Sequence, residues 1–356
     1  MKYIGILALL FSVLNTALAA EPILASGRWV HKNGSYQATW PGGVLSAQFT
    51  GQRIGIALND ERSYYAVEVD GQFLLNIAPA AGKRVIWLKN LTAARHRIDL
   101  IRRNETPDYI GQVAGFVLEE GGQWLPAPAA KKRKIEFIGD SFTAALAGLS
   151  TQRECKDADL AANTDIRQGF AVNVARELDA EWQINAMSGM GLVRNWNGHL
   201  PDRDFRTFYP RTIQSDATAV VTTTDWQPQI VVIALGLNDF STPINSTEKR
   251  NAEQLAADYQ SAYQALITEI NAKYQQPQIV LMSYKVWPDD QLRVQVPAVM
   301  AAAKAAGLRN VHYLAVNPLQ LTACQWHPNL QDHQQIAQQL LVKIREIKPL
   351  WFTATQ

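Results

Sequence analysis

The chain has 356 residues, of which 47% are hydrophobic and 19% are charged, with 21 Gly and 16 Pro. This balance is typical of a globular protein long enough for two hydrophobic cores, and it excludes disorder and collagen-like repetition. Lys and Arg total 34 against 32 for Asp and Glu, a net charge of +2. So small a charge provides no basic field for phosphate backbones, and we expect no nucleic acid partner.

The first twenty residues have the order of a secretory signal. A basic start, Met1-Lys2, precedes an apolar run over residues 3–13, and small residues over 17–20 precede Glu21. The apolar run is shorter than the ~20 residues needed to span a bilayer. We therefore predict a signal peptide at residues 1–20, no membrane partner or anchor, and a mature protein that is secreted or periplasmic.

Residues 21–125 follow a pattern of period two. Residues 54–58 and 97–100 alternate in this way, and Asp70-Gly71 between apolar segments is a hairpin signal. Glycine recurs at short intervals, and no stretch keeps helical spacing for three turns. We predict a β-sandwich here, followed by a Pro- and Ala-rich linker at 126–133.

Residues 134–352 alternate short apolar segments with segments of helical spacing. This alternation predicts an α/β domain, a parallel sheet covered by helices on both faces. Strand candidates are 135–138, 182–186, 230–235, 279–283 and 311–314, and helical spacing marks 170–178, 255–270 and 336–347, the last with Asn329 as N-cap.

Four short segments that follow strand candidates carry useful chemistry. Loops at the carboxyl ends of parallel strands gather at one rim of the sheet, so we expect these segments to meet. Acyl transfer needs a hydroxyl nucleophile, a nitrogen base and oxyanion donors, and the segments supply all three. They are Gly139-Asp140-Ser141-Phe142, Ser188-Gly189-Met190-Gly191, Gly236-Leu237-Asn238-Asp239 and Trp326-His327-Pro328.

Together, these segments resemble the four blocks of the GDSL, or SGNH, hydrolases, in the same order. With the sandwich ahead of them and Cys324-Gln325-Trp326-His327-Pro328 at the end, nearly all of the chain after residue 20 is similar to carbohydrate esterase family two. The resemblance implies a jelly-roll sandwich joined to a three-layer, flavodoxin-like SGNH domain. It also implies a serine esterase that removes acetyl groups from polysaccharides such as xylan and glucomannan through an acetyl-enzyme intermediate.

The resemblance assigns Ser141 as nucleophile and His327 as base. The oxyanion donors would be the backbone amides of Ser141 and Gly189 and the side-chain amide of Asn238. SGNH hydrolases usually carry an aspartate three residues before the histidine, but Cys324 stands there in this chain. Some members of the esterase family are similar, with a Ser-His dyad whose histidine is oriented by a main-chain carbonyl. A carboxylate from elsewhere in the chain is the alternative.

Cys155 and Cys324 are the only cysteines. In an exported chain we predict that they form a disulfide between the loop after Ser141 and the histidine loop, with two buried free thiols as the alternative. They are too few and too widely spaced for a zinc site, and we expect neither metal nor organic cofactor.

Two tryptophans lie beside the proposed active-site segments. Trp326 precedes the proposed base and Trp196 follows the Gly189 turn, so both are predicted to stack on sugar rings, with core packing as the alternative. Asp140, next to the nucleophile, completes the predicted substrate-binding set.

The expected partner is an acetylated polysaccharide or oligosaccharide, bound by a monomer. Two other functions stay open. The same machinery could serve a GDSL lipase, a thioesterase or a cell-envelope O-acetyltransferase, or the chain could be a non-catalytic carbohydrate-binding protein in which the sandwich binds the ligand.

Overall fold

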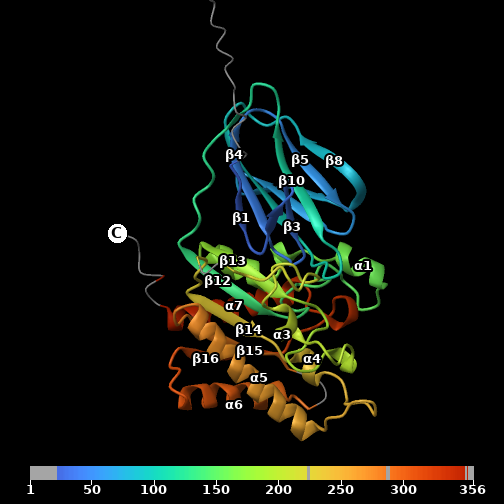
Figure 1. Ribbon diagram of the computed structural model, residues 1–356, viewed down its shortest axis with the longest axis vertical. Coiled ribbons are helices and arrows are strands. Elements are labelled where there is room, and N and C mark those ends of the chain that lie inside the picture. The colour runs from blue at the N-terminus through green and yellow to red at the C-terminus, as the bar shows by residue number, and fades with distance from the viewer. Residues whose placement is uncertain (1–21, 223–224, 286–288, 349–350, 352–356) are drawn as a thin grey trace, which may run out of the picture.

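The computed structural model describes residues 22–222, 225–285, 289–348 and 351, and Figure 1 shows them as two domains stacked end to end. The signal peptide predicted at residues 1–20 lies outside the described residues. Within the described ranges, no helix is both long enough and apolar enough to cross a membrane.

The N-terminal domain is an antiparallel β-sandwich, as predicted. A hydrophobic core lies between its two sheets, because alternate residues of each strand point inward. One sheet has the order β1-β4-β9-β6-β7 with β11 paired to β4, and the other has the order β2-β3-β10-β5-β8. The strands are β1 (Leu24–Ser26), β2 (Val30–Lys32), β3 (Ser35–Ala38), β4 (Val44–Thr50), β5 (Ile54–Asp60), β6 (Tyr65–Val69), β7 (Gln72–Ile77), β8 (Ala80–Leu88), β9 (Arg95–Arg102), β10 (Gly111–Leu118) and β11 (Gln123–Trp124).

The second domain is built on a five-stranded parallel sheet. Its order is β13-β12-β14-β15-β16, which is the flavodoxin-like order 2-1-3-4-5 when the strands are counted along the chain. All five strand candidates are confirmed. The strands are β12 (Arg133–Gly139), β13 (Ala180–Ala186), β14 (Ile230–Ala234), β15 (Gln278–Ser283) and β16 (Val311–Ala315).

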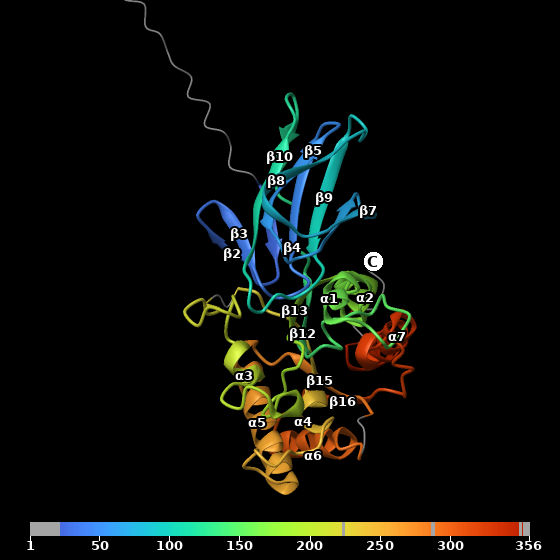
Figure 2. The ribbon, with the colours of Figure 1, turned by 90° about the vertical axis from the view of Figure 1, so that its right-hand side faces the viewer.

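Helices cover both faces of this sheet. Figure 2 shows α2 and α7 together on one side and α3, α5 and α6 on the other, and a separate apolar core lies under each set. Asn329 caps α7 as predicted, because its side chain accepts the amide of Asp332. The helices are α1 (Asp157–Ala162), α2 (Phe170–Glu177), α3 (Phe205–Phe208), α4 (Leu237–Phe240), α5 (Ala252–Lys273), α6 (Leu292–Ala305) and α7 (Leu330–Ile347), with 3-10 turns η1 (Ile166–Gln168), η2 (Trp196–Gly198) and η3 (Cys324–Trp326).

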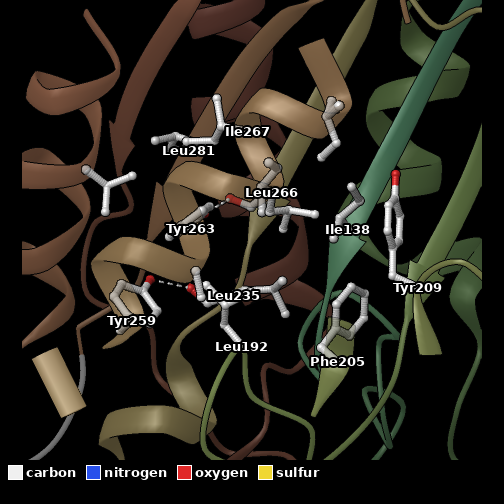
Figure 3. Packing of buried hydrophobic residues seen from close by; sticks show 14 of the residues in the cluster. Ile138, Leu192, Phe205, Tyr209, Leu235, Tyr259, Tyr263, Leu266, Ile267 and Leu281 are labelled. Carbon is white, nitrogen blue, oxygen red and sulfur yellow. Dashed lines mark hydrogen bonds between the residues drawn. The ribbon is translucent and has the colours of Figure 1, made fainter. Parts of the chain in front are cut away.

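Core packing under α5 fixes the end of β14. Figure 3 shows the hydroxyls of Tyr259 and Tyr263 directed toward the strand, where they donate to the carbonyls of Leu235 and Ile233 at 2.9 and 3.3 Å. Burial of these two aromatic side chains stabilises the helix–sheet contact, and their hydroxyls satisfy carbonyls that face the core. The loop after β14 therefore starts from a rigid position.

The sandwich packs on the β13 edge of the parallel sheet. Trp182 of β13 donates its indole N–H to the carbonyl of Gly42 at 2.9 Å. Arg28, only 5% exposed, lies between the rings of Trp40 and Tyr209 and donates to the carbonyls of Tyr209 and Arg211. Buried donors with partners across the interface hold the two domains in one arrangement.

Candidate active site

The proposed nucleophile lies in the turn that leaves β12. Ser141 is 6% exposed, and among the described residues its backbone N–H has no acceptor. Asp140 is fully buried, and its Oδ1 accepts the amide of Phe142 at 3.1 Å. Its carboxylate thus shapes the turn from inside, and the expected role of Asp140 in substrate binding stays a prediction.

The proposed base lies against this turn. The ring of His327 packs edge-on against Phe142, with 5.7 Å between ring centroids, so the histidine loop adjoins the residue after Ser141. Its Nδ1 lies 2.8 Å from the carbonyl oxygen of Cys324. A carbonyl can only accept, so Nδ1 carries the proton and Nε2 presents a lone pair. The orienting group is the main-chain carbonyl, as in the dyad arrangement, and no carboxylate takes this place among the described residues.

Burial lowers the pKa of His327, and its hydrogen bond to the Cys324 carbonyl opposes this effect. A base must be unprotonated to accept a proton, so a lowered pKa keeps the imidazole ready at neutral pH.

The predicted disulfide is confirmed. Cys155 and Cys324 are bonded, with 5.5 Å between their Cα atoms. Arg153 reinforces the link, since its side chain donates to the carbonyls of Gln320 and Leu321. The segment after Ser141 and the loop that carries His327 are thus joined both covalently and by hydrogen bonds.

Gly189 and Asn238 lie in neighbouring loops of the rim. Gly189 has φ of +74°, which favours glycine, and among the described residues its N–H has no acceptor. Asn238 belongs to the short helix α4 and gives one side-chain N–H to the carbonyl of Met190 at 3.0 Å. An amide has two such hydrogens, so the second is left for a ligand. The three predicted oxyanion donors therefore retain unused N–H groups.

Asp239 fixes these two loops relative to each other. Its carboxylate accepts the amides of Leu192, Val193 and Arg194 at 2.8, 2.8 and 2.9 Å. Burial raises the pKa of Asp239 to about 6, while these three amides oppose the shift. The motif residue next to Asn238 thus clamps the loop that carries Gly189.

The turn at η2 presents an exposed tryptophan ring beside Gly189. The amide of Trp196 donates to the Gly189 carbonyl at 3.0 Å, and the Trp196 side chain is 54% exposed. The buried side chain of Asn195 holds the turn by donating to the carbonyls of His199, Leu200 and Arg203. A rigid backbone that leaves a large aromatic side chain in solvent suits ligand stacking better than core packing.

Trp326 is also exposed, at 62% of its surface. The guanidinium of Arg153 lies over its ring, 3.8 Å from the centroid, so one face is covered and the other is open. Neither Trp196 nor Trp326 is a core residue.

Asp140 and Asp239 are buried carboxyls at the rim. Burial raises the pKa of Asp140 to about 7, and the charge of Asp239 adds to this shift.

Within the described part of the chain, no group of three or more His, Cys, Asp or Glu side chains is arranged to hold a metal ion.

Four residues of the site were missed by sequence reasoning. Asp239 lies in one of the four segments but had no predicted role, and Arg194 and Asn195 follow the Gly189 segment after Leu192 and Val193. Arg194 is 4% exposed and pairs with Glu248 at 2.6 Å. The fourth, Glu105, comes from the sandwich and accepts the amide of Ser188. A polar run after a glycine turn is a weak signal for the first three, and no local signal marks the fourth.

Family comparisons agree with the two-domain structure. The Carbohydrate esterase 2 N-terminal family matches residues 25–128, and the GDSL-like Lipase/Acylhydrolase family matches residues 137–340.

Individual relatives match both domains at once. The chain is 33% identical over 318 residues to an acetylxylan esterase / glucomannan deacetylase of Cellvibrio japonicus, which covers 89% of this chain and 87% of the relative. A solved carbohydrate esterase is 31% identical with a TM-score of 0.84, covering 93% of this chain and 99% of the other. A family two carbohydrate esterase from Clostridium thermocellum, solved with cellohexaose, is 26% identical with a TM-score of 0.83 over 92% and 99% of the chains.

Proposed function

The chain belongs to carbohydrate esterase family 2, and from this membership we propose that it removes acetyl groups from polysaccharides of the xylan and glucomannan type. It is a carboxylic ester hydrolase of the carbohydrate esterase class. The acetylated sugar polymer, the residue roles and the site of action are the proposed parts.

Ser141 acts as nucleophile in this proposal. Its Oγ attacks the acetyl carbonyl carbon while Nε2 of His327 takes the hydroxyl proton. The amides of Ser141 and Gly189 and the second N–H of Asn238 receive the developing oxyanion, where each donor is worth about a hundred- to a thousandfold in turnover. The tetrahedral adduct then collapses, and the imidazolium returns its proton to the departing sugar oxygen.

Water completes the cycle. It attacks the acetyl-serine ester with His327 again as base, and acetate leaves as Ser141 regains its proton. The observation that carries the mechanism is the 2.8 Å hydrogen bond from His327 Nδ1 to the Cys324 carbonyl, because it leaves Nε2 unprotonated.

Trp196 and Trp326 are the proposed sugar-stacking residues, since both are exposed at this rim. We also propose a monomer with domain limits of 21–125 and 134–352 around the 126–133 linker, and action outside the cytoplasm. The leader-like residues 1–20 and the Cys155–Cys324 disulfide support that location, because disulfides persist in oxidising compartments.

Hydrolysis of 4-nitrophenyl acetate, butyrate and octanoate by the wild-type protein and by Ser141→Ala tests the reaction. Acetate release from acetylated xylan and glucomannan tests the substrate. We expect acetyl selectivity in the wild type and loss of turnover in Ser141→Ala. Ser261→Ala, on the exposed face of α5, is the matched control and should keep full activity. A preference for octanoate, or an active Ser141→Ala protein, would contradict the proposal.

A further inference from the structure

A carboxylate of the sandwich reaches the rim of the hydrolase sheet. Glu105 lies in the loop after β9, and its two oxygens lie 3.0 and 3.2 Å from the backbone nitrogen of Ser188, which donates to them. Ser188 immediately precedes Gly189 in the loop after β13. The N-terminal domain thus contacts the loop that provides an oxyanion donor.

The two residues that precede Glu105 in the sequence are both anchored. Arg103 donates to the carbonyl of Thr164 at 2.8 Å, and its own carbonyl accepts the amide of Ile166 at 3.1 Å. Asn104 accepts the amide of Tyr64 at 2.8 Å. Glu105 therefore extends from a fixed backbone, so that its carboxylate has a defined position at Ser188.

The amides around Gly189 have protein partners. Ser188 donates to Glu105, Met190 to the carbonyl of Met187, and Gly191 to Asn195. Among the described residues, only the Gly189 amide in this run of four lacks an acceptor. Glu105 holds the amide of Ser188, on the N-terminal side of the Ser188–Gly189 peptide. This contact limits rotation of that peptide, and thereby sets the direction of the unused Gly189 N–H.

We propose that Glu105 is a positioning residue for deacetylation, which holds the Ser188 amide so that the Gly189 N–H points at the acetyl oxyanion. This inference rests on the proposed function. It makes the sandwich a working part of the active site, since it supplies the acceptor that orients an oxyanion donor of the other domain.

The burial of Glu105 disfavours the charged form of its carboxyl group. Burial raises the pKa of Glu105 to about 7, while hydrogen bonds from Ser188 and the charge of Arg102 oppose the shift. The role needs an acceptor at Ser188 and needs no negative charge. Glutamine keeps an acceptor oxygen at nearly the same place, whereas methionine keeps the length of the side chain and removes the acceptor.

The test compares Glu105→Met and Glu105→Gln with wild type in 4-nitrophenyl acetate hydrolysis. We expect Glu105→Met to lower kcat by about tenfold or more with little change in KM, because an oxyanion donor acts in the transition state. The kcat of Glu105→Gln should stay within about threefold of the wild-type kcat, because glutamine still accepts the hydrogen bond from Ser188. Inhibition by methylboronic acid, which forms a tetrahedral adduct with serine, should weaken in parallel with kcat.

Glu68→Ala is the matched control. Glu68 is another sandwich carboxylate that crosses the interface, but it pairs with Arg176 at 2.8 Å, at the C-terminal end of α2. This control should lower the thermal midpoint and leave kcat and boronate inhibition unchanged. Equal losses in Glu68→Ala and Glu105→Met, or a wild-type kcat in a folded Glu105→Met protein, would overturn the inference.

Glu105→Gln provides the second check, which does not depend on the folding of Glu105→Met. A folded Glu105→Gln protein that loses kcat tenfold would show that the acceptor is not the requirement, and would overturn the inference. A wild-type protein without acetyl ester hydrolysis would instead overturn the proposed function on which the inference rests.

Discussion

Cys324 serves His327 in two ways: its carbonyl oxygen lies 2.8 Å from the imidazole Nδ1, and its side chain is one end of the only disulfide. The position that carries an aspartate in many SGNH hydrolases thus orients the proposed base, His327, without adding a negative charge. A neutral carbonyl stabilises the imidazolium less than a carboxylate does. We therefore expect proton transfer to depend more on the fixed orientation of the His327 ring.

The double variant Cys155→Ser/Cys324→Ser should lose both stability and turnover. The bond closes a loop of 169 residues in sequence separation, worth about 5 kcal/mol by loop-closure entropy. Release of the histidine loop should lower kcat roughly ten- to hundredfold, because small misplacements of a base are costly. Urea unfolding measures the loss of stability, and 4-nitrophenyl acetate turnover measures the loss of kcat. Reduced wild-type protein is the comparison. An unchanged kcat in the double variant would show that the disulfide does not position His327.

The acid limb of the pH–rate profile should lie below the ordinary value for histidine. Burial lowers the pKa of His327 from 6.5, and only the unprotonated ring accepts the serine proton. Activity is then lost as pH falls through the lowered pKa and stays level from there to neutral pH. The dependence of kcat/KM for 4-nitrophenyl acetate on pH between 4 and 8 reports this limb. An apparent pKa above 7 would point to a different titrating group.

Asp140→Asn should make stability less dependent on pH. Burial raises the pKa of Asp140 from 3.8 to about 7, so this carboxyl favours the folded state at low pH, and that contribution is lost as pH rises through about 7. At about 1.4 kcal/mol per pKa unit, the loss is at most about 4 kcal/mol. Asparagine keeps the acceptor for Phe142 and removes the ionisation.

Urea unfolding at pH 5 and pH 8 measures the effect. Asp140→Asn should gain stability relative to wild type on going from pH 5 to pH 8. Asp108→Asn, whose side chain is 73% exposed, is the control and should follow wild type. Parallel pH dependences in wild type and Asp140→Asn would refute the assignment.

Trp196→Ala should affect polymer and small ester differently. Loss of a stacking ring should raise KM for acetylated xylan or glucomannan about five- to tenfold, the equivalent of about 1 kcal/mol. Hydrolysis of 4-nitrophenyl acetate, which has no sugar ring, should keep its kcat. Phe73→Ala, which removes a 47% exposed ring from β7 of the sandwich, is the matched control. Equal effects of both variants on the polymer would argue against a sugar platform at η2.

Much of the architecture could be predicted because its signals are local. Strand periodicity and the four short segments placed Ser141, Gly189, Asn238 and His327 at one rim, and parallel strands necessarily bring their carboxyl ends together. The cysteine pair was predictable because only two cysteines exist.

Other features had no local signal. The helix α6 was not predicted, and it contains Pro297 in its interior, a residue that usually ends helices. The burial of Asp140 could not be predicted, because a sequence does not say on which side of a turn a carboxylate lies. Glu105 was missed because its partner Ser188 is distant in the chain and belongs to the other domain.

The domain interface also determines when the structure can be completed. Arg28 and Trp40 donate to carbonyls 183 and 171 residues further along the chain. Both donors belong to the sandwich and their acceptors to the second domain, so these hydrogen bonds cannot form before the second domain presents its carbonyls. Contacts of such sequence separation form late, after each domain has its own core. We therefore expect the contact from Glu105 to Ser188, like the other contacts between the domains, to form when the two folded domains dock.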